Sequence, residues 1–299
     1  MVVEKTPNME KTLLSERGKN RIKSLGMNLI LIIGAVVMLT PLLWMLATAL
    51  SPNTKIPPTS LIPHDITFEN FVEAWNFPKA FSPNPDKPIT MGTFFMNSLI
   101  CTVSITALGI VVDSLAAYVL AFKQFPGKRL FIFLALATMM IPFYVTLVPE
   151  YLIIRKLKWI NTYKAMIIPF LASGMGISLF RSHFLSIAKE LEECGKLDGA
   201  SDFRVYLTIV MPISRPIIGT MAILKAMWSW NQYMWPLIVS TNIGMKPIQV
   251  ALNMFRGLNL TEWGYLCAGM TMAIMPLVIL FLCAQKQFIG GLTAGAVKG

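Results

Sequence analysis

Long apolar runs separated by short polar segments dominate the pattern of this chain. A helix needs about 20 mostly apolar residues to cross the hydrocarbon core of a membrane. Six runs approach or exceed that length, and they cover residues 27–50, 93–121, 130–150, 165–180, 216–240 and 263–284. The pattern therefore predicts an all-α membrane protein with six transmembrane helices.

Composition supports this interpretation. Of the 299 residues, 55% are hydrophobic and only 14% are charged, and the mean hydropathy is +0.61. A soluble domain is far less apolar. The first run exceeds the roughly 7–15 apolar residues of a secretory signal peptide. We therefore expect it to remain as the first span rather than to be cleaved.

The distribution of basic residues predicts the orientation. Of the 26 lysines and arginines, 16 fall in segments 1–26, 122–129, 181–215 and 285–299, and nine fall in segments 50–92, 151–164 and 241–262. Cytoplasmic segments carry the excess of Lys and Arg. Both termini are therefore expected in the cytoplasm, and the net charge of +11 reflects topology rather than nucleic-acid binding.

Two segments outside the membrane differ in character. Residues 1–26 form a polar, cytoplasmic N-terminal segment, and residues 27–299 form the membrane domain. The outer loop, residues 51–92, is rich in proline, which prevents a long helix but allows a short one from Phe68 to Trp75 with Thr67 as its cap. We expect an ordered cap over the outer mouth of the bundle, with a disordered linker as the alternative.

Signatures of enzymes are missing from the sequence. There are two histidines, no HExxH motif and no Cys/His cluster with metal-ligand spacing. The phosphate-binding pattern GxxxxGK[ST] is also absent. We therefore expect a chain that is not an enzyme, holds no metal ion or other cofactor, and has no ATPase site of its own.

Two ionisable residues, Asp113 and Lys225, fall within predicted spans. Charged groups in a membrane are costly and suggest a functional site. They leave open an ion-coupled secondary carrier or channel, in which these two residues would titrate. The alternative is a helix interface that neutralises them.

The end of the fifth run, "MWSWNQYMWPL", combines aromatic rings with amides. Aromatic rings at this place are typical of the membrane interface. They could equally pack against the C–H faces of sugar rings while amides bind the hydroxyl groups. The candidate residues for a substrate path are Trp228, Trp230, Asn231, Gln232 and Tyr233.

A charged stretch, "ELEECGKLDGAS" at 190–201, interrupts the apolar pattern on the cytoplasmic side. Ser186 is positioned to cap a short helix in which Ile187, Leu191 and Cys194 recur on one side. Glu192 is predicted to pair with Lys196 at i+4.

The same stretch has a stop signal. Gly199 can adopt the left-handed conformation that ends helices, and Ser201 or Asp202 can start the next helix. Pro212 and Pro216 interrupt that helix before it re-enters the membrane.

The spacing of Glu193, Gly199, Ile209 and Pro212 resembles the "EAA" signature of permease subunits of bacterial ATP-binding-cassette (ABC) importers. "SLAAYVLAFKQFPGKR" at 114–129, "WSWNQYMWPL" at 228–237 and "GLTAGAVKG" at 291–299 are similar to carbohydrate-uptake permeases, above all the six-span partner of maltose-type importers. The two alanines of the signature are Cys194 and Gly195 here, and Gly195 should weaken the helix by about 1 kcal/mol.

This resemblance implies a type I importer permease fold in the bacterial plasma (inner) membrane, with a cytoplasmic coupling loop at 181–215. The residues that would couple to the ATPase are Glu190, Glu193, Asp198, Gly199, Ile209 and Pro212. The implied partners are a second homologous permease, two ATPase subunits that bind ATP and Mg, and an extracellular solute-binding protein. The implied substrate is a carbohydrate, an oligosaccharide in particular.

Overall fold

The computed structural model describes the backbone of residues 7–52, 61–63, 65–256 and 262–296, and the side chains of these residues between 24 and 283. Over these residues the protein consists of helices and turns, without a β-strand. The longer helices are α1 (Pro7–Leu50), α3 (Met91–Phe122), α4 (Lys128–Met140), α5 (Phe143–Lys156), α7 (Gly174–Phe184), α11 (Arg215–Trp230) and α14 (Trp263–Ala296). The shorter ones are α2 (Glu69–Asn76), η1 (Phe77–Phe81), α6 (Tyr163–Ile167), η2 (Ile168–Phe170), α8 (Lys189–Leu197), α9 (Asp202–Val205), η3 (Tyr206–Val210), α10 (Met211–Ile213), α12 (Met234–Val239), η4 (Ile243–Met245), α13 (Ile248–Ala251) and η5 (Leu252–Phe255).

Three helices are long and apolar enough to cross a membrane without a break: α1 over Ser24–Leu50, α3, and α14 over Trp263–Cys283. Three further spans are formed only if each bent pair of helices counts as one. The pairs are α4 with α5, α6 and η2 with α7, and Asp202–Ile213 with α11, with bends of 105°, 41° and 82°. By length and composition, the described residues thus contain three unbroken spans, and up to six if each bent pair is one span.

One of these breaks, and a further interruption within the fifth apolar run, can be located in the sequence. The turn between α4 and α5 contains Ile141 and Pro142, and a residue before proline avoids the helical conformation. In the fifth run, α11 ends at Trp230 and α12 begins at Met234. The prediction of one continuous helix over 216–240 is therefore wrong, because a turn at 231–233 separates the two.

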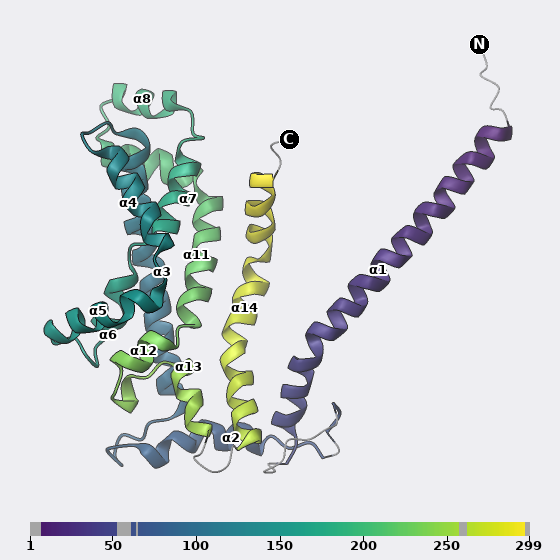
Figure 1. Ribbon diagram of the computed structural model, residues 1–299, viewed down its shortest axis with the longest axis vertical. Helices are drawn as coiled ribbons and strands as arrows, with labels where there is room; N and C mark the ends of the chain where they lie inside the picture. The colour runs from purple at the N-terminus through teal and green to yellow at the C-terminus, as the bar shows by residue number, and fades with distance from the viewer. Residues whose placement is uncertain (1–6, 53–60, 64, 257–261, 297–299) are drawn as a thin grey trace.

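Helix α3 is the centre of the bundle and packs against both α7 and α11, while α14 packs against α11 and α1. Figure 1 shows α3, α7 and α11 running together, and α1 leaning away from them so that only its C-terminal end approaches the other helices. Large apolar side chains of α1 are accordingly exposed, among them Ile30 at 71% and Met38 at 79%. A membrane or a neighbouring chain must cover this surface.

One end of the bundle is closed by ordered loops. Asn70 in α2 donates hydrogen bonds to the carbonyl groups of Ala49 and Ser51 at the end of α1, at 2.9 and 2.6 Å. The helix predicted from Phe68 to Trp75 is α2. Its N-cap is Phe68 and no side chain caps it, so the prediction that Thr67 is the cap is wrong, although the Glu69 amide donates to Thr67 Oγ1 at 3.1 Å. The described parts of the proline-rich loop are therefore folded against the bundle, whereas residues 53–60 and 64 lie outside the described residues.

The opposite end carries α8. Figure 1 shows α8, the start of α1 and the end of α14 at this same end, and α2 at the other. This arrangement places the segment 189–197 on the side where the first helix begins and the last one finishes.

Candidate functional site

The short helix α8 lies across the end of the bundle, connected by turns to α7 and α9 (Figure 1). It begins after Ala188, and no side chain caps it. Ser186 instead donates its hydroxyl to the His183 carbonyl at 2.7 Å. The prediction that Ser186 caps this helix is wrong, because the helix begins three residues later and the hydroxyl is used at the end of α7.

Glu192 attaches α8 to the bundle. Its carboxylate lies 2.8 Å from Lys123 Nζ and 2.7 Å from Lys196 Nζ, and only 9% of its side chain is exposed. Lys123 follows the last turn of α3 and also pairs with Asp202 at the start of α9. The predicted pair of Glu192 and Lys196 is confirmed. Lys123 links three segments and was missed, because its partners lie 69 and 79 residues away in the chain.

The electrostatics of this cluster favour the charged forms. Burial acts to raise the pKa of Glu192, but hydrogen bonds from Lys123 and Lys196 outweigh it and hold the pKa below its ordinary value. Burial acts to lower the pKa of Lys123, and hydrogen bonds to Asp202 and Glu192 outweigh it and raise the pKa. The ion pairs therefore persist at neutral pH.

The opposite side of α8 is exposed and apolar. Leu197 is 87% exposed and Leu191 is 43% exposed, and Cys194 is an exposed free thiol between them. Glu190 and Glu193 are exposed beside them and form no ion pair with the described residues. The apolar side chains at 191 and 194 thus face away from the bundle, and the face that the bundle holds is the charged one.

Gly195 allows α8 to lie close to the segment that follows it. A Cβ at this buried position would lie 2.8 Å from Ile209 Cδ1 and 3.1 Å from Val205 Cγ2. The glycine that replaces an alanine of the signature is therefore accommodated by close packing. It also brings Ile209, which is half-buried, against the underside of α8.

Gly199 ends this segment in the left-handed conformation, with φ at +77°. Its amide donates to the Lys196 carbonyl at 2.9 Å, and the next amide, of Ala200, donates to the Gly195 carbonyl at 3.0 Å. Asp198 before it is exposed. Ser201 then caps α9 by accepting from the Arg204 amide at 3.3 Å, so the predicted stop and restart are both confirmed.

The return to the membrane passes through an irregular helix. Residues Tyr206–Val210 form a π-helical turn, and the exposed Pro212 follows in α10. Proline has no amide hydrogen for the carbonyl four residues earlier, so the regular ladder cannot continue there. Tyr206 fixes the turn to α3, because its hydroxyl lies 2.8 Å from Ser114 Oγ. The chain then bends by 82° into α11.

The second candidate site lies at the other end of α11. Asn231 and Tyr233, in the turn after the helix, are exposed. Asn231 Oδ1 accepts from Gln249 Nε2 at 3.5 Å, and Tyr233 accepts a short hydrogen bond from Asn253 Nδ2. The structure therefore gathers two amide-bearing pairs with an exposed phenol on one surface.

The other candidate residues of this path lie apart from that surface. Trp228 is 46% exposed and stacks edge to face on Phe170, with ring centroids 5.0 Å apart. Gln232 is half-buried. Trp230 is 4% exposed, and its indole N–H donates to the Ala273 carbonyl at 3.0 Å.

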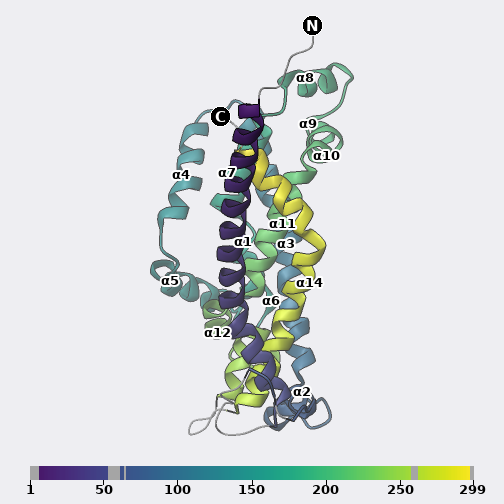
Figure 2. The same ribbon diagram turned by 90° about the vertical axis from the view of Figure 1, so that its right-hand side faces the viewer.

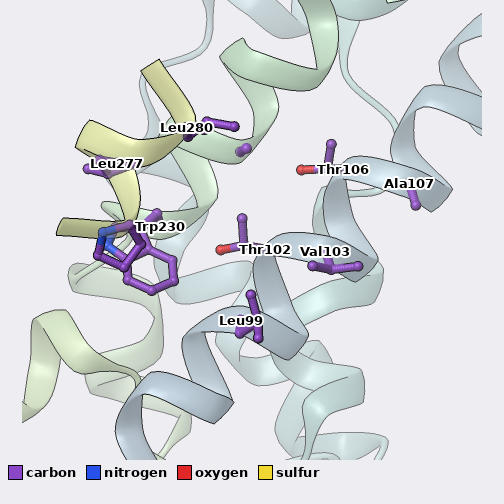
Figure 3. A pocket seen from close by; sticks show the side chains of 10 residues that line it. Leu99, Thr102, Val103, Thr106, Ala107, Trp230, Leu277 and Leu280 are labelled. Carbon is purple, nitrogen blue, oxygen red and sulfur yellow. The ribbon is translucent and has the colours of Figure 1, made fainter. Parts of the chain in front are cut away.

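Trp230 forms part of the wall of a cavity of about 330 Å³ between α3, α11 and α14. Thr102 and Thr106 contribute hydroxyl groups that are buried and have no hydrogen-bond partner among the described residues. Figure 3 shows both hydroxyls directed toward the side of the cavity where Trp230 and Leu277 lie. The remaining lining is apolar.

Asp113 and Lys225 form a buried ion pair. Asp113 Oδ2 lies 2.8 Å from Lys225 Nζ, and the two side chains are 0% and 8% exposed. Asp113 also accepts from the backbone amide and the hydroxyl of Ser173, both at 2.8 Å. Ser173 precedes α7, so the pair connects α3, α7 and α11. Each charge is thus neutralised inside the bundle, which is the helix-interface alternative.

Comparisons with known proteins agree with this geometry. Residues 109–290 match the family model described as "Binding-protein-dependent transport system inner membrane component". The chain is 39% identical over 262 residues to the probable ABC transporter permease protein YurM of Bacillus subtilis, covering 87% of this chain and 83% of that protein. It is 31% identical to the trehalose/maltose transport system permease protein MalG of Thermococcus litoralis, covering 91% and 97%.

A solved structure shows the same fold. It is a bacterial ABC transporter involved in the import of the acidic polysaccharide alginate, with a TM-score of 0.77, 23% identity and coverage of 90% of this chain and 97% of that one. The chain therefore has the fold of an ABC importer permease. It belongs to the family of binding-protein-dependent transport system inner membrane components.

Its function is accordingly that of a permease subunit in an ABC importer, as the resemblance implied. The alternative of an ion-coupled carrier has no support. Asp113 and Lys225 neutralise each other, and the relatives are ABC permeases.

Proposed function

We propose that this chain forms one half of the membrane path of a carbohydrate importer and that α8 is its docking element for an ATPase subunit. The observation that carries the proposal is the polarity of α8. Its charged residue Glu192 is held against the bundle, while Leu191 and Leu197 are left exposed. An amphipathic helix with exposed apolar anchors is suited to a hydrophobic groove on a partner.

The acidic residues of the same face give this contact a second component. Glu190 and Glu193 are exposed and form no ion pair with the described residues, so they are available to basic groups at the edge of the ATPase groove. Gly199 and Pro212 determine where α8 ends and where the chain turns back. In this proposal the ATPase binds ATP and Mg, and this chain has no ATPase activity.

The orientation follows from the same element. An ATPase is reached from the cytoplasm, and α8 lies at the end of the bundle where α1 begins and α14 finishes (Figure 1). We therefore place both termini in the cytoplasm. The ordered loops around α2 then face outward, where a solute-binding protein would deliver the substrate. A second permease would complete the path, with two ATPase subunits in the assembly.

The transported class is proposed to be carbohydrate, an oligosaccharide in particular. A relative that is 31% identical is named for trehalose and maltose, and the exposed group of Asn231, Tyr233, Gln249 and Asn253 offers amides and a phenol to sugar hydroxyls. Trp228, Gln232 and Trp230 lie apart from this group, and the indole N–H of Trp230 is used inside the bundle by the Ala273 carbonyl. Asn231→Ala should reduce sugar uptake by the whole complex at unchanged subunit content, whereas Asn76→Ala, an exposed amide of α2, should not.

The docking proposal can be tested with the thiol already present on α8. In the complete complex with Cys283→Ser, a photoreactive probe on Cys194 should crosslink to the ATPase subunit. The control carries Cys194→Ser and Asn84→Cys, which moves the probe to the loop at the other end, and it should spare the ATPase. A complex that hydrolyses ATP normally while its Cys194 probe never reaches the ATPase would refute the docking role of α8.

A further inference from the structure

A basic cavity lies at the α8 end of the bundle, outside the sites described above. Its volume is about 470 Å³, and it is lined by Gln124, Phe125, Gly127, Lys128, Arg129, Ile132 and Arg181. Three of these side chains are cations, and among the described residues no carboxylate lies within ion-pair distance of any of them. The cavity therefore has an excess of positive charge that the chain itself does not neutralise.

Two of the cations are held in place by α3. Lys128 Nζ donates to the Lys123 carbonyl at 2.7 Å, and Arg181 Nε donates to the Leu120 carbonyl at 3.3 Å. These are carbonyl groups at the C-terminal end of α3, where cations are stabilised. Arg181 has further N–H donors beyond this one bond. Arg129 is exposed at the rim.

An apolar slot continues from this cavity along the same two helices. It measures about 80 Å³ and is lined by Leu120, Ile132, Ala135, Leu136, Ile177, Ser178 and Arg181. Ile132 and Arg181 line both spaces. Ala135 and Leu136 lie one turn further along α4, and Ile177 lies one turn before Arg181 in α7. The basic cavity thus adjoins one end of the apolar slot between α4 and α7.

Helix α4 forms one wall of the slot and lies on the outside of the bundle, where lipid could reach the slot. No residue of α4 is buried, and Figure 2 shows α4 at the edge of the molecule. Phe131 and Phe133 on this helix are 58% and 64% exposed. In a membrane, a helix exposed in this way contacts acyl chains wherever no neighbouring subunit covers it.

We propose that the cavity between α4 and α7 binds an anionic phospholipid, with the phosphate group at Lys128, Arg129 and Arg181 and the start of one acyl chain in the slot. Basic pockets between helices on the cytoplasmic side suit acidic head groups. A free phosphate ion would satisfy the cations and leave the slot unused, so the slot favours a lipid. The inference rests on the membrane location of the chain and on the orientation proposed above, and not on what the chain transports.

The test uses the complete transport complex in nanodiscs of phosphatidylcholine, with short-chain phosphatidylglycerol added as the probe and bound lipid counted by native mass spectrometry. The wild-type complex should retain phosphatidylglycerol in preference to phosphatidylcholine. A basic residue near a membrane surface contributes enough that Arg129→Gln should weaken binding about fivefold, and Arg129→Gln with Arg181→Gln about 30-fold. Arg155→Gln, an exposed arginine of α5, is the control and should bind normally.

The role of the slot is tested by substituting a larger side chain that leaves the net charge unchanged. Ser178→Phe should fill the slot and abolish retention of the probe, whereas Ser182→Phe, one turn away and outside both spaces, should not.

Inorganic phosphate in excess should compete weakly with the probe in the wild-type complex. Equal retention of the two lipids, or a probe unaffected by Ser178→Phe but displaced by phosphate, would overturn the lipid site. Loss of the ATPase from the Arg129→Gln complex with lipid retention unchanged would assign the cavity to a protein contact and also overturn it.

Discussion

Lys123, at the end of α3, lies 2.8 Å from the carboxylate of Glu192 in α8, and this pair attaches the exposed helix to the membrane-spanning bundle. The pair therefore joins α8 directly to α3, which packs against both α7 and α11. The attachment combines this ionic contact with close packing of Gly195 against Ile209 and Val205, while Leu191 and Leu197 face outward.

Breaking this pair should uncouple the complex. Lys123→Met leaves the mostly buried Glu192 carboxylate with Lys196 alone, and a lost hydrogen bond to a charged group costs about 1.5–3 kcal/mol. Glu192→Gln should have a similar effect. The double variant should cost less than the sum of the two, as for residues in direct contact.

The measurement is the ratio of uptake to ATP hydrolysis in complexes of equal subunit content. Lys189→Met, which removes an exposed lysine from α8, is the control and should couple normally. Additive losses in the double variant would show that the pair does not act as a unit.

The attachment should also depend on pH in a defined window. Because the pKa of Glu192 lies below its ordinary value of 4.5, its contribution is present above that value and is lost as the pH falls through the lowered pKa. The pKa of Lys123 lies above its ordinary 10.5, so its contribution is present below 10.5 and is lost only at higher pH.

A spin label on Cys194 in the Cys283→Ser background should therefore keep constant mobility across neutral pH and become more mobile only in acid, as the pH falls through the lowered pKa of Glu192. Glu192→Gln should be equally mobile at neutral and acidic pH. A wild-type label that loosens between pH 6 and 8 would contradict this assignment and point to another titrating group.

Substitutions of Gly199 should be tolerated in proportion to how easily the new residue adopts the left-handed backbone conformation. A Cβ at this position has no atom within 4 Å, so the cost of a substitution is conformational, about 1–2 kcal/mol for a side chain such as valine. Gly199→Val should impair coupling, and Gly199→Asn should be milder. Both should insert normally into the membrane, which a measurement of subunit abundance would check. Equal coupling in wild type and Gly199→Val would mean that the end of α8 has no role in transmission.

Asp113 and Lys225 should behave as a structural pair. Removing one partner of a buried ion pair costs about 3–5 kcal/mol, since it leaves an unpaired charge. Lys225→Met should thus reduce the amount of folded complex. Asp113→Asn together with Lys225→Met should restore much of it, because neither charge remains.

Uptake by that double variant distinguishes the two functions considered for these residues. Substantial uptake is expected of a permease driven by a separate ATPase. The opposite result would be a double variant that folds well but does not transport, together with proton- or ion-dependent uptake by the wild-type complex. That result would indicate a direct role of Asp113 and Lys225 in transport.

The apolar runs predicted the spans well because the requirement they express, length in hydrocarbon, is local. The stop at Gly199 and the pair of Glu192 and Lys196 were also local, and both were predicted. The outward direction of Leu191 and Cys194 was not. A periodic stripe on its own does not show which side faces the protein, and here the bundle holds α8 through Lys123 at Glu192 and through close packing at Gly195.

The anchoring role of Lys123 depends on contacts between segments far apart in the sequence, which spacing along the chain cannot reveal. The same holds for Asp113, whose partners come from two other helices. The turn after Trp230 was missed for a different reason. Residues 216–240 are mostly apolar on both sides of Asn231 and Gln232, so mean hydropathy does not mark the break that the turn at Asn231 introduces.

Two glycines set the space in which the buried pair sits. A Cβ at Gly176 would lie 1.9 Å from Asp113 Oδ2, and one at Gly109 would lie 2.9 Å from Lys225 Nζ. The two charged residues and the two glycines should therefore vary together among related chains, because a methyl group at position 176 would displace the Asp113 carboxylate. Related permeases with a larger residue at the place of Gly176 should have lost the acid at the place of Asp113 as well, and chains that keep one should keep the other.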